Sequence, residues 1–515
     1  MQKIIMKNLK NLKKSHLILI LGLLVISLVA CVDAPVIRDN RSEIGRSFNS
    51  LKNYSEPEAV SLVVQLIKWP DKHKQTTWPS FKFSELPTLV HFANGHIYAI
   101  GLNSTDSRWS KLSFEGHHVL FSEVDYWGIS NVTLTPAFPI EGKIAYVFKL
   151  DFKGQVSEST FITFLHERFH AHQFMHFSNL GLQSSLKYSA HTNEENVALI
   201  ALENSILKNW MSNRSVEMLK DFLAVNALRL KLLDKESMAW EESQQRMEGL
   251  ADYISWKISE KSELITLSNL KTRLQSDSEK YFSLTQDGID NVIKWRHYLV
   301  GALLGEALDL YGPKNWKDTT EKKGQSSIDI LRNSVQLNES EKGTRVVQAK
   351  RNYKYDDLKT EVKTSISKYL SLIQTHTKEF SSLPGIQLAI GNSNEANCSG
   401  GGYSERTFYL SNGGKLDLST SGYHSCGKTI KADYKNIPIL FTEPRAIRLK
   451  INADTQITIG SHSVTARDIL RAKDTQAFEN IKLTSPDFNF ESTGLRGKIR
   501  VDQNQLVLEF DKDRL

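Results

Sequence analysis

The sequence contains little cysteine and no arrangement of cysteines typical of a metal site. Its 515 residues include three cysteines and no CxxC pair, and two or three isolated cysteines are a poor zinc-binding set. No internal repeat is evident. Charged residues make up 24% and aromatic residues 9%, which excludes wholesale disorder and collagen-like or other low-complexity chains. With 40% apolar residues, the chain is long enough for two to four domains.

The N-terminal segment has the layout of an export signal. Residues 1–31 carry five lysines and no acid, and Leu17–Ala30 is almost entirely apolar. This run is shorter than the roughly 20 residues that a spanning helix needs. The end of the run, Leu28-Val29-Ala30-Cys31, resembles the lipobox of bacterial lipoproteins, in which Cys31 is lipidated and becomes the mature N-terminus. An uncleaved anchor helix is the alternative, and in both cases the chain is exported and tethered to a membrane of the cell envelope. Val32 after the cysteine favours the outer membrane.

Removing the signal changes what the charge implies. The formal net charge of +7, less the five signal lysines, leaves +2 for the mature chain. No basic stripe then remains, so we expect no nucleic-acid partner. Cys398 and Cys426 lie 28 positions apart, and in an oxidising compartment we expect them to form a disulfide.

The spacing of apolar residues changes along the rest of the chain between the patterns of strands and of helices, which predicts an α+β protein. We expect a tether over 32–55, a β-rich part over 56–150, a helical part over 151–375 and a β-rich C-terminal domain over 380–515. Three local expectations are a strand at Leu62–Leu66, a hairpin turning at Asn94-Gly95 and a strand at Ile144–Phe148. The charged stretch 314–365 indicates solvated surface with loops, and the C-terminal domain reads as a small sandwich.

One motif carries chemistry. His166-Glu167-Arg168-Phe169-His170 has the form HExxH, within an apolar run that favours a buried helix. Histidines four residues apart lie on one helical face, where both imidazoles can bind one Zn²⁺ ion. Glu167 then flanks the metal-bound water, where it can act as general base.

A zinc site needs a third protein ligand, and several acids and histidines compete for this role. His176 lies ten residues after His166, but Gln173 stands where the pattern HExxHxxGxxH needs glycine, so His176, like His172, reads as a flanking polar residue. Glu195 follows Asn193-Glu194 but has no acid four residues later. Glu248 is favoured because Asp252, one helical turn on, can accept a hydrogen bond from a ligating histidine.

HExxH followed by a separate helix bearing Glu-x-x-x-Asp resembles the gluzincin branch of the zincin metallopeptidases. The resemblance covers roughly residues 140–310 and implies a zincin-like catalytic domain with zinc ligands His166, His170 and Glu248. It also implies Glu167 as base, Asp252 as the partner of a ligating histidine, and a sheet edge that binds extended substrate. Gluzincins use a downstream His or Tyr to stabilise the transition state, and His297 and Tyr298 are the candidates here. The spacing from His170 to Glu248 exceeds that of thermolysin-like members.

The sequence therefore predicts a zinc metallopeptidase tethered to the bacterial envelope, acting on a peptide or protein substrate. Two alternatives stay open: a zinc amidase acting on cell-wall peptides, and an inactive binding lipoprotein that reuses the fold. The intact His166, Glu167 and His170 argue against the last.

Overall fold

The computed structural model describes residues 53–510 except for short internal segments. These segments are 73–76, 115, 130–133, 152–153, 181–187, 263–269, 286–287, 392–397, 405, 411–413, 427–429, 443–445 and 495. The predicted signal, Cys31 and most of the predicted tether lie outside the described residues. Within the described part of the chain, no helix is long and apolar enough to cross a membrane.

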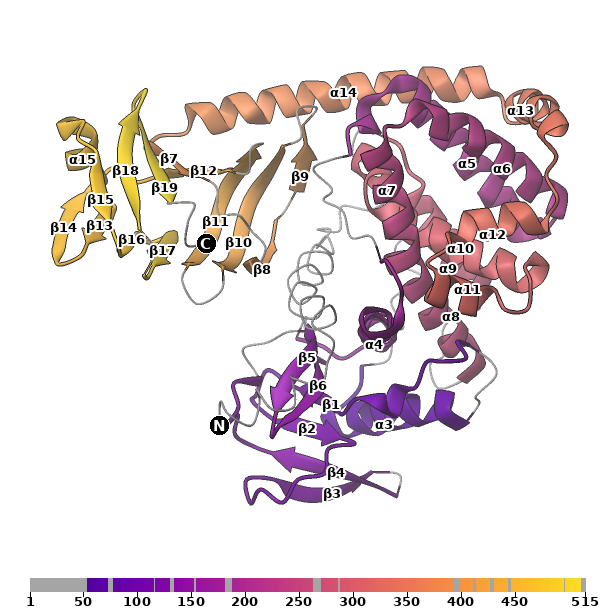
Figure 1. Ribbon diagram of the computed structural model, residues 1–515, viewed down its shortest axis with the longest axis horizontal. Coiled ribbons are helices and arrows are strands. Elements are labelled where there is room, and N and C mark those ends of the chain that lie inside the picture. The colour runs from indigo at the N-terminus through magenta and orange to yellow at the C-terminus, as the bar shows by residue number, and fades with distance from the viewer. Residues whose placement is uncertain are drawn as a thin grey trace. The chain divides into compact units, whose positions relative to one another are not determined.

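The fold is a mixture of helices and strands, as the sequence predicts, and it divides into two compact units (Figure 1). Among the described residues the first unit covers 53–366 and the second 367–510. The division falls inside the long helix α14, Tyr355–Ser382.

A six-stranded sheet opens the first unit, in the order β3-β4-β2-β1-β6-β5. Its strands are β1 (Thr88–His91), β2 (Ile97–Ile100), β3 (Ser110–Phe114), β4 (His117–Ser122), β5 (Leu134–Ile140) and β6 (Lys143–Lys149). The predicted hairpin is confirmed, with Val90 opposite Tyr98 in an antiparallel pair. The strand predicted at Ile144–Phe148 is β6, which pairs parallel with β1. All other pairs in this sheet are antiparallel among the described residues.

The first element of this unit corrects a sequence prediction. Leu62–Leu66 lies in helix α3 (Glu56–Lys72), so the expected strand is wrong. Ser55 starts the helix, because its backbone N–H and hydroxyl donate to the Glu58 carboxylate at 2.9 and 2.8 Å. Buried side chains then recur every three or four residues, at Ala59, Val60, Val63, Val64 and Ile67. The last residues of the predicted tether therefore belong to the folded unit.

Helix α4 (Glu158–His176) carries the HExxH motif and lies within the main core of the unit. A capping box between Ser157 and Thr160 begins the helix. Its phenylalanines pack against the same core as Tyr146 and Phe148 of β6, whereas Ala145 and Val147 point into a separate core on the opposite face of the sheet. This shared core holds α4, which carries the motif, against one face of the sheet.

The rest of the first unit is helical, as expected for 151–375 (Figure 1). The longer helices are α5 (Glu194–Asn213), α6 (Val216–Arg229), α7 (Lys235–Gln244), α8 (Leu250–Ser262), α9 (Leu270–Tyr281) and α10 (Trp295–Tyr311). A π-helical turn, η7 (Gln245–Gly249), joins α7 to α8. Short 3-10 turns are η2 (Phe83–Glu85), η5 (Ala190–Thr192), η6 (Leu230–Leu232) and η8 (Ile289–Val292).

The expectation of loops over 314–365 is wrong. This stretch forms α11 (Trp316–Lys323), α12 (Ser327–Ser334), α13 (Glu339–Asn352) and the start of α14. Its charges lie largely on exposed faces, where pairs such as Lys322–Asp318 at 2.8 Å join residues one turn apart. High charge density indicated the surface correctly, but it does not distinguish a loop from a solvated helix.

The second unit is β-rich, as predicted, but a single branched sheet of 13 described strands replaces the expected sandwich. Its strands are β7 (Ile386–Gly391), β8 (Cys398–Tyr403), β9 (Arg406–Tyr409), β10 (Lys415–Cys426), β11 (Ile430–Thr442), β12 (Ala446–Ile451), β13 (Gln456–Ile459), β14 (His462–Thr465), β15 (Gln476–Phe478), β16 (Ile481–Thr484), β17 (Phe488–Ser492), β18 (Gly497–Asp502) and β19 (Gln505–Phe510), with the short helix α15 (Ala466–Ala472). The long strand β11 pairs with β10, β12 and β17, which keeps the sheet continuous.

The two C-terminal cysteines stand opposite each other in this sheet. Cys426 of β10 is the register partner of Cys398 of β8 in an antiparallel ladder. The side chains of both residues lie outside what is described, so the disulfide stays a prediction.

Candidate metal centre

The two histidines of the HExxH motif meet on one side of α4. The rings of His166 and His170 lie 4.6 Å apart between centroids and nearly perpendicular, at 89°. Both residues are buried, and Glu167 belongs to the same group, with one ligand atom of each residue within 4.8 Å of the others. The helical i, i+4 spacing thus produces the arrangement that the motif predicts.

Glu248 joins this group from the π-turn η7. Its Oε2 atom lies 3.2 Å from Nε2 of His166 and 3.2 Å from Nε2 of His170. The Glu248 side chain is fully buried, and its Oε1 atom has no hydrogen-bond partner among the described residues. A carboxylate rarely stays buried with one oxygen unsatisfied unless a further group binds there.

The far nitrogens of both rings are engaged, which determines where their lone pairs point. Nδ1 of His166 donates to Oδ1 of Asp252 at 2.7 Å, and Nδ1 of His170 donates to Oε1 of Gln173 at 2.7 Å. These hydrogen bonds assign the proton of each neutral ring to Nδ1 and leave a lone pair on Nε2. Two imidazole lone pairs and a carboxylate oxygen therefore converge on one point.

The two separations that involve Glu248 fit a metal ion. Ligand atoms about 2.0–2.1 Å from a tetrahedral Zn²⁺ lie about 3.3–3.4 Å from one another. Both separations from Glu248 are 3.2 Å, so a small outward movement of the side chains admits an ion. The residues His166, His170 and Glu248 fit a divalent metal in donor type, number and spacing.

Protons compete for the same atoms. Burial lowers the pKa of His166, but hydrogen bonds with Asp252 and Glu248 outweigh it and raise that pKa well above its ordinary value. Burial raises the pKa of Glu248, yet the neighbouring charge of His170 and hydrogen bonds from both imidazoles lower it far below its ordinary value. Because a cation and ring protons satisfy the same carboxylate, metal affinity falls as the pH falls.

Gln173 is a residue of the candidate site that the sequence did not reveal. Besides accepting from His170, its Nε2 donates to the backbone carbonyls of Arg246 and Met247 at 2.9 and 3.0 Å. These carbonyls belong to η7, so the fully buried Gln173 ties the motif helix to the turn that carries Glu248. Single π-turns inside helices are frequently found at functional sites. A buried glutamine gives no local signal of a partner 73 residues away.

Of the two candidates for transition-state stabilisation, the structure brings Tyr298 to the histidines. The Tyr298 ring stacks on that of His166 with centroids 5.9 Å apart and planes at 6°. His297 is fully buried and faces charged neighbours that include Glu241 and Arg296. None of the interactions found among the described residues joins His297 to the motif histidines.

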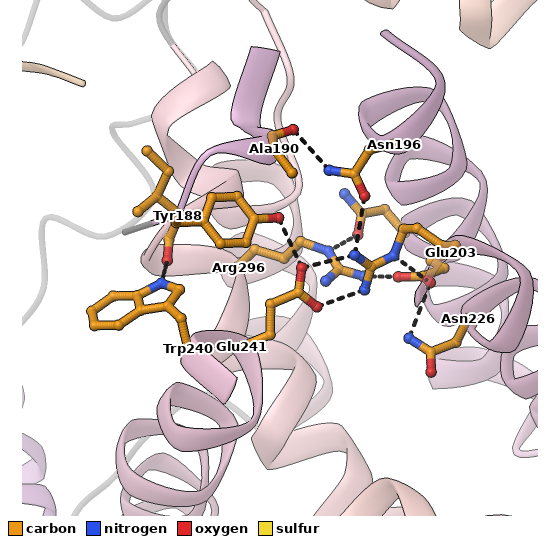
Figure 2. A network of polar contacts seen from close by, with 11 residues as sticks. Tyr188, Ala190, Asn196, Glu203, Asn226, Trp240, Glu241 and Arg296 are labelled. Carbon is orange, nitrogen blue, oxygen red and sulfur yellow. Dashed lines mark hydrogen bonds and ion pairs between the residues drawn. The ribbon is translucent and has the colours of Figure 1, made fainter. Parts of the chain in front are cut away.

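A buried network of charges braces the helices that carry Glu248 and Tyr298 (Figure 2). Arg229 donates to both oxygens of Glu241 at 2.7 Å and to Glu203 at 2.8 Å, while Arg296 also donates to Glu203. Burial raises the pKa of Glu241, but the charge and hydrogen bonds of Arg229 lower it to about 2. Two arginines and two glutamates compensate one another, so α5, α6, α7 and α10 meet without an unpaired charge.

The other candidates for the third ligand lie elsewhere. Glu195 sits at the start of α5 and is half exposed, where it accepts from Tyr355 at 2.9 Å and from Lys359 at 2.5 Å. His176 contacts Glu85 at 3.0 Å instead of the HExxH group. Glu248 is therefore the candidate that the structure places against both motif histidines.

Comparisons of the chain with protein-family models, with curated proteins and with solved structures found no match.

Proposed function

We propose that this protein is a zinc-dependent metallopeptidase of the gluzincin type. The observation that carries the proposal is the convergence of His166, His170 and Glu248 on one point with Glu167 beside it. Two imidazoles and one carboxylate are a recurrent ligand set of catalytic zinc, which keeps a further position open. When bound, the ion supplies Lewis acidity to a carbonyl and lowers the pKa of water.

The chain's own residues account for the remaining steps of peptide hydrolysis. Glu167 takes a proton from the attacking water and passes it to the leaving amine, which is the work of a general base and then a general acid. Asp252 and Gln173 hold the two imidazoles in the tautomer that presents Nε2. Tyr298, next to His166, supplies a hydroxyl that can donate to the developing oxyanion.

The sheet of the first unit supports a peptide as substrate. Strand β5 lies at one edge of the sheet, pairs with β6 and packs against α4. An extended peptide can add to such an edge through main-chain hydrogen bonds at residues other than Pro136 and Pro139, which have no N–H to donate, close to the helix that carries Glu167. This edge is the feature for which we propose a peptide or protein as the substrate. The lipid anchor at Cys31 and the envelope location belong to the same proposal and rest on the signal pattern alone.

Hydrolysis by a Glu167→Gln variant tests the proposal. The full mature chain in detergent, loaded with zinc, is incubated with a peptide library and the products are read by mass spectrometry. Because Glu167 is the base and not a ligand, we expect Glu167→Gln to retain zinc and lose about a thousandfold in rate. Glu195→Gln is the matched control and keeps the rate. Equal hydrolysis by wild type and Glu167→Gln would refute the mechanism.

A further inference from the structure

Helix α4 carries a second pair of histidines at the same spacing. His172 and His176 are four residues apart, as are His166 and His170, and the second pair is shifted by six positions along the chain relative to the first. At about 100° per residue the second pair is rotated by about 240° from the first, so it faces a different part of the protein. The rings of His172 and His176 lie 4.6 Å apart between centroids, the same separation as in the first pair.

A carboxylate completes the second group. Glu85, the last residue of η2, lies with its two oxygens 3.0 and 3.1 Å from Nε2 of His176. One ligand atom of each of Glu85, His172 and His176 lies within 4.8 Å of the others. This set, like the HExxH group with Glu248, offers two imidazoles and one carboxylate.

His172 is held in the form that binds metals. Its Nε2 lies 3.4 Å from Oε2 of Glu321, which also accepts from Trp78 at 2.6 Å and from Ser80. A carboxylate can only accept, so Nε2 carries the proton and Nδ1 carries a lone pair. Nδ1 of His172 is buried and has no hydrogen-bond partner among the described residues. An ion pair between Glu85 and His176 explains those two residues, but it leaves this nitrogen unsatisfied.

We propose that Glu85, His172 and His176 form a second metal site for Zn²⁺ or a similar first-row divalent ion. Imidazole nitrogens with a carboxylate suit such ions better than Ca²⁺ or Mg²⁺. The side chains of His176 and Glu85 are 35% and 32% exposed, so an ion and its remaining water ligands reach the site from solvent. Glu321 holds the far side of His172, the usual support of a ligating histidine.

The ion would link η2 to α4. Glu85 precedes the first strand of the sheet, whereas His172 and His176 form the last turns of α4, and Glu321 belongs to α11. A metal bound here joins η2 to α4 and thereby stabilises the first unit. The site does not depend on the proposed peptidase activity.

Zinc binding is measured in a His166→Ala/His170→Ala protein, which lacks two ligands of the first site. Isothermal titration with Zn²⁺ is expected to show one equivalent, and zinc is expected to raise the Tm. Adding Glu85→Gln or His176→Ala should weaken this binding at least tenfold and remove the Tm shift. His376→Ala is the matched control, because His376 pairs with Glu379 at 2.7 Å without belonging to a three-residue metal group among the described residues.

Two results overturn the proposal: no zinc binding by the double variant, or binding that Glu85→Gln and His176→Ala leave unchanged. If the double variant does not fold, Glu85→Gln is compared with the wild type, and it should bind one zinc equivalent fewer. An equal number in the two proteins also refutes the second site. A wild type that binds zinc at the second site but hydrolyses no peptide would count against the peptidase proposal alone.

Discussion

Gln173 shows how one buried side chain can contact both parts of a candidate metal centre. It accepts from His170 and donates to two carbonyls of η7, so it orients one proposed ligand and supports the turn that carries another. The same residue stands where the pattern HExxHxxGxxH needs glycine, so at the sequence level it counted only against that pattern. Its partners in η7 lie more than 70 positions away, and no local pattern reveals them.

A Gln173→Met variant should keep the volume of the side chain and lose all three hydrogen bonds. Removing a partner that orients a ligating histidine typically costs 10- to 100-fold in metal affinity, and we expect a loss of about that size. A competition titration with a chromophoric chelator measures the zinc dissociation constant. Gln65→Met on α3 is the control, because Gln65 contacts only Ser61 of its own helix at 3.4 Å among the hydrogen bonds found. An unchanged zinc dissociation constant in Gln173→Met would show that Gln173 does not support the metal ligands.

His297 makes the stability of the first unit depend on pH. Burial lowers the pKa of His297 to about 4, against an ordinary value of 6.5. Below about pH 6.5 the imidazole binds a proton in the unfolded chain but stays neutral in the folded chain. The free energy of unfolding is therefore highest above that pH and falls as the pH drops toward 4. The difference corresponds to about 3 kcal/mol.

Denaturant unfolding of the metal-free protein at a series of pH values tests this. We expect His297→Gln to show a shallower loss of unfolding free energy between about pH 6.5 and 4.5 than the wild type. Parallel curves for the two proteins would contradict the assignment.

At the scale of elements, a close crossing of η7 and α10 sets the distance between Glu248 and Tyr298. A Cβ atom added to Gly301 would lie 2.3 Å from the Gln245 carbonyl oxygen and 2.7 Å from Cα of Gly249. The backbones therefore touch where each helix carries a residue of the site. Only glycine at both positions permits this approach.

Gly301→Ala is expected to destabilise the protein by about 1–3 kcal/mol and to weaken zinc binding, because η7 must move away from α10. Gly343→Ala on α13 is the control, since its added Cβ meets nothing within 4 Å. Alanine there should raise stability by up to about 1 kcal/mol, through its better helix propensity. Chemical unfolding and zinc titration of both variants give the comparison. Equal stability of Gly301→Ala and wild type would show that the backbones of η7 and α10 do not approach this closely at Gly301.

Elements whose signals are local could be predicted from the sequence. The hairpin at Asn94-Gly95 has its turn residues and alternating strands within a dozen positions, and the HExxH helix brings its own i, i+4 pair. The strand predicted at Leu62–Leu66 was wrong because five residues with four apolar positions show neither the alternation of a strand nor the three-to-four-residue spacing of a helix. The cap that starts α3 lies outside that window. The π-turn and its hydrogen bonds to Gln173 depend on tertiary contacts that no window contains.

At the scale of the whole molecule, the chain consists of a first unit, which has a six-stranded sheet, many helices and the candidate metal centre, and a β-rich second unit. The sequence predicted the mixed α+β class, with a helical region and a β-rich C-terminal part, whereas the single branched sheet of the second unit depends on pairings between distant strands. β7 and β19, for example, pair in parallel although they are more than a hundred residues apart.

A disulfide between Cys398 and Cys426 should stabilise the second unit by about 3 kcal/mol, because it closes a loop of 28 positions in the unfolded chain. We expect Cys398→Ser to lower the Tm of that unit and to leave zinc content and hydrolysis unchanged. Calorimetry shows the Tm, and mass spectrometry under non-reducing conditions shows the bond. Free thiols at both positions in protein purified from an oxidising compartment would contradict the pairing.

The zinc content of Glu248→Ala, compared with wild type by elemental analysis, tests the central claim most directly. His166, His170 and Glu248 hold one ion in this account, so Glu248→Ala should carry one zinc equivalent fewer than wild type. Glu195→Ala, which removes the competing acid at the start of α5, should lose none. Equal zinc in wild type and Glu248→Ala, or no zinc in the wild type at micromolar supply, would contradict the account.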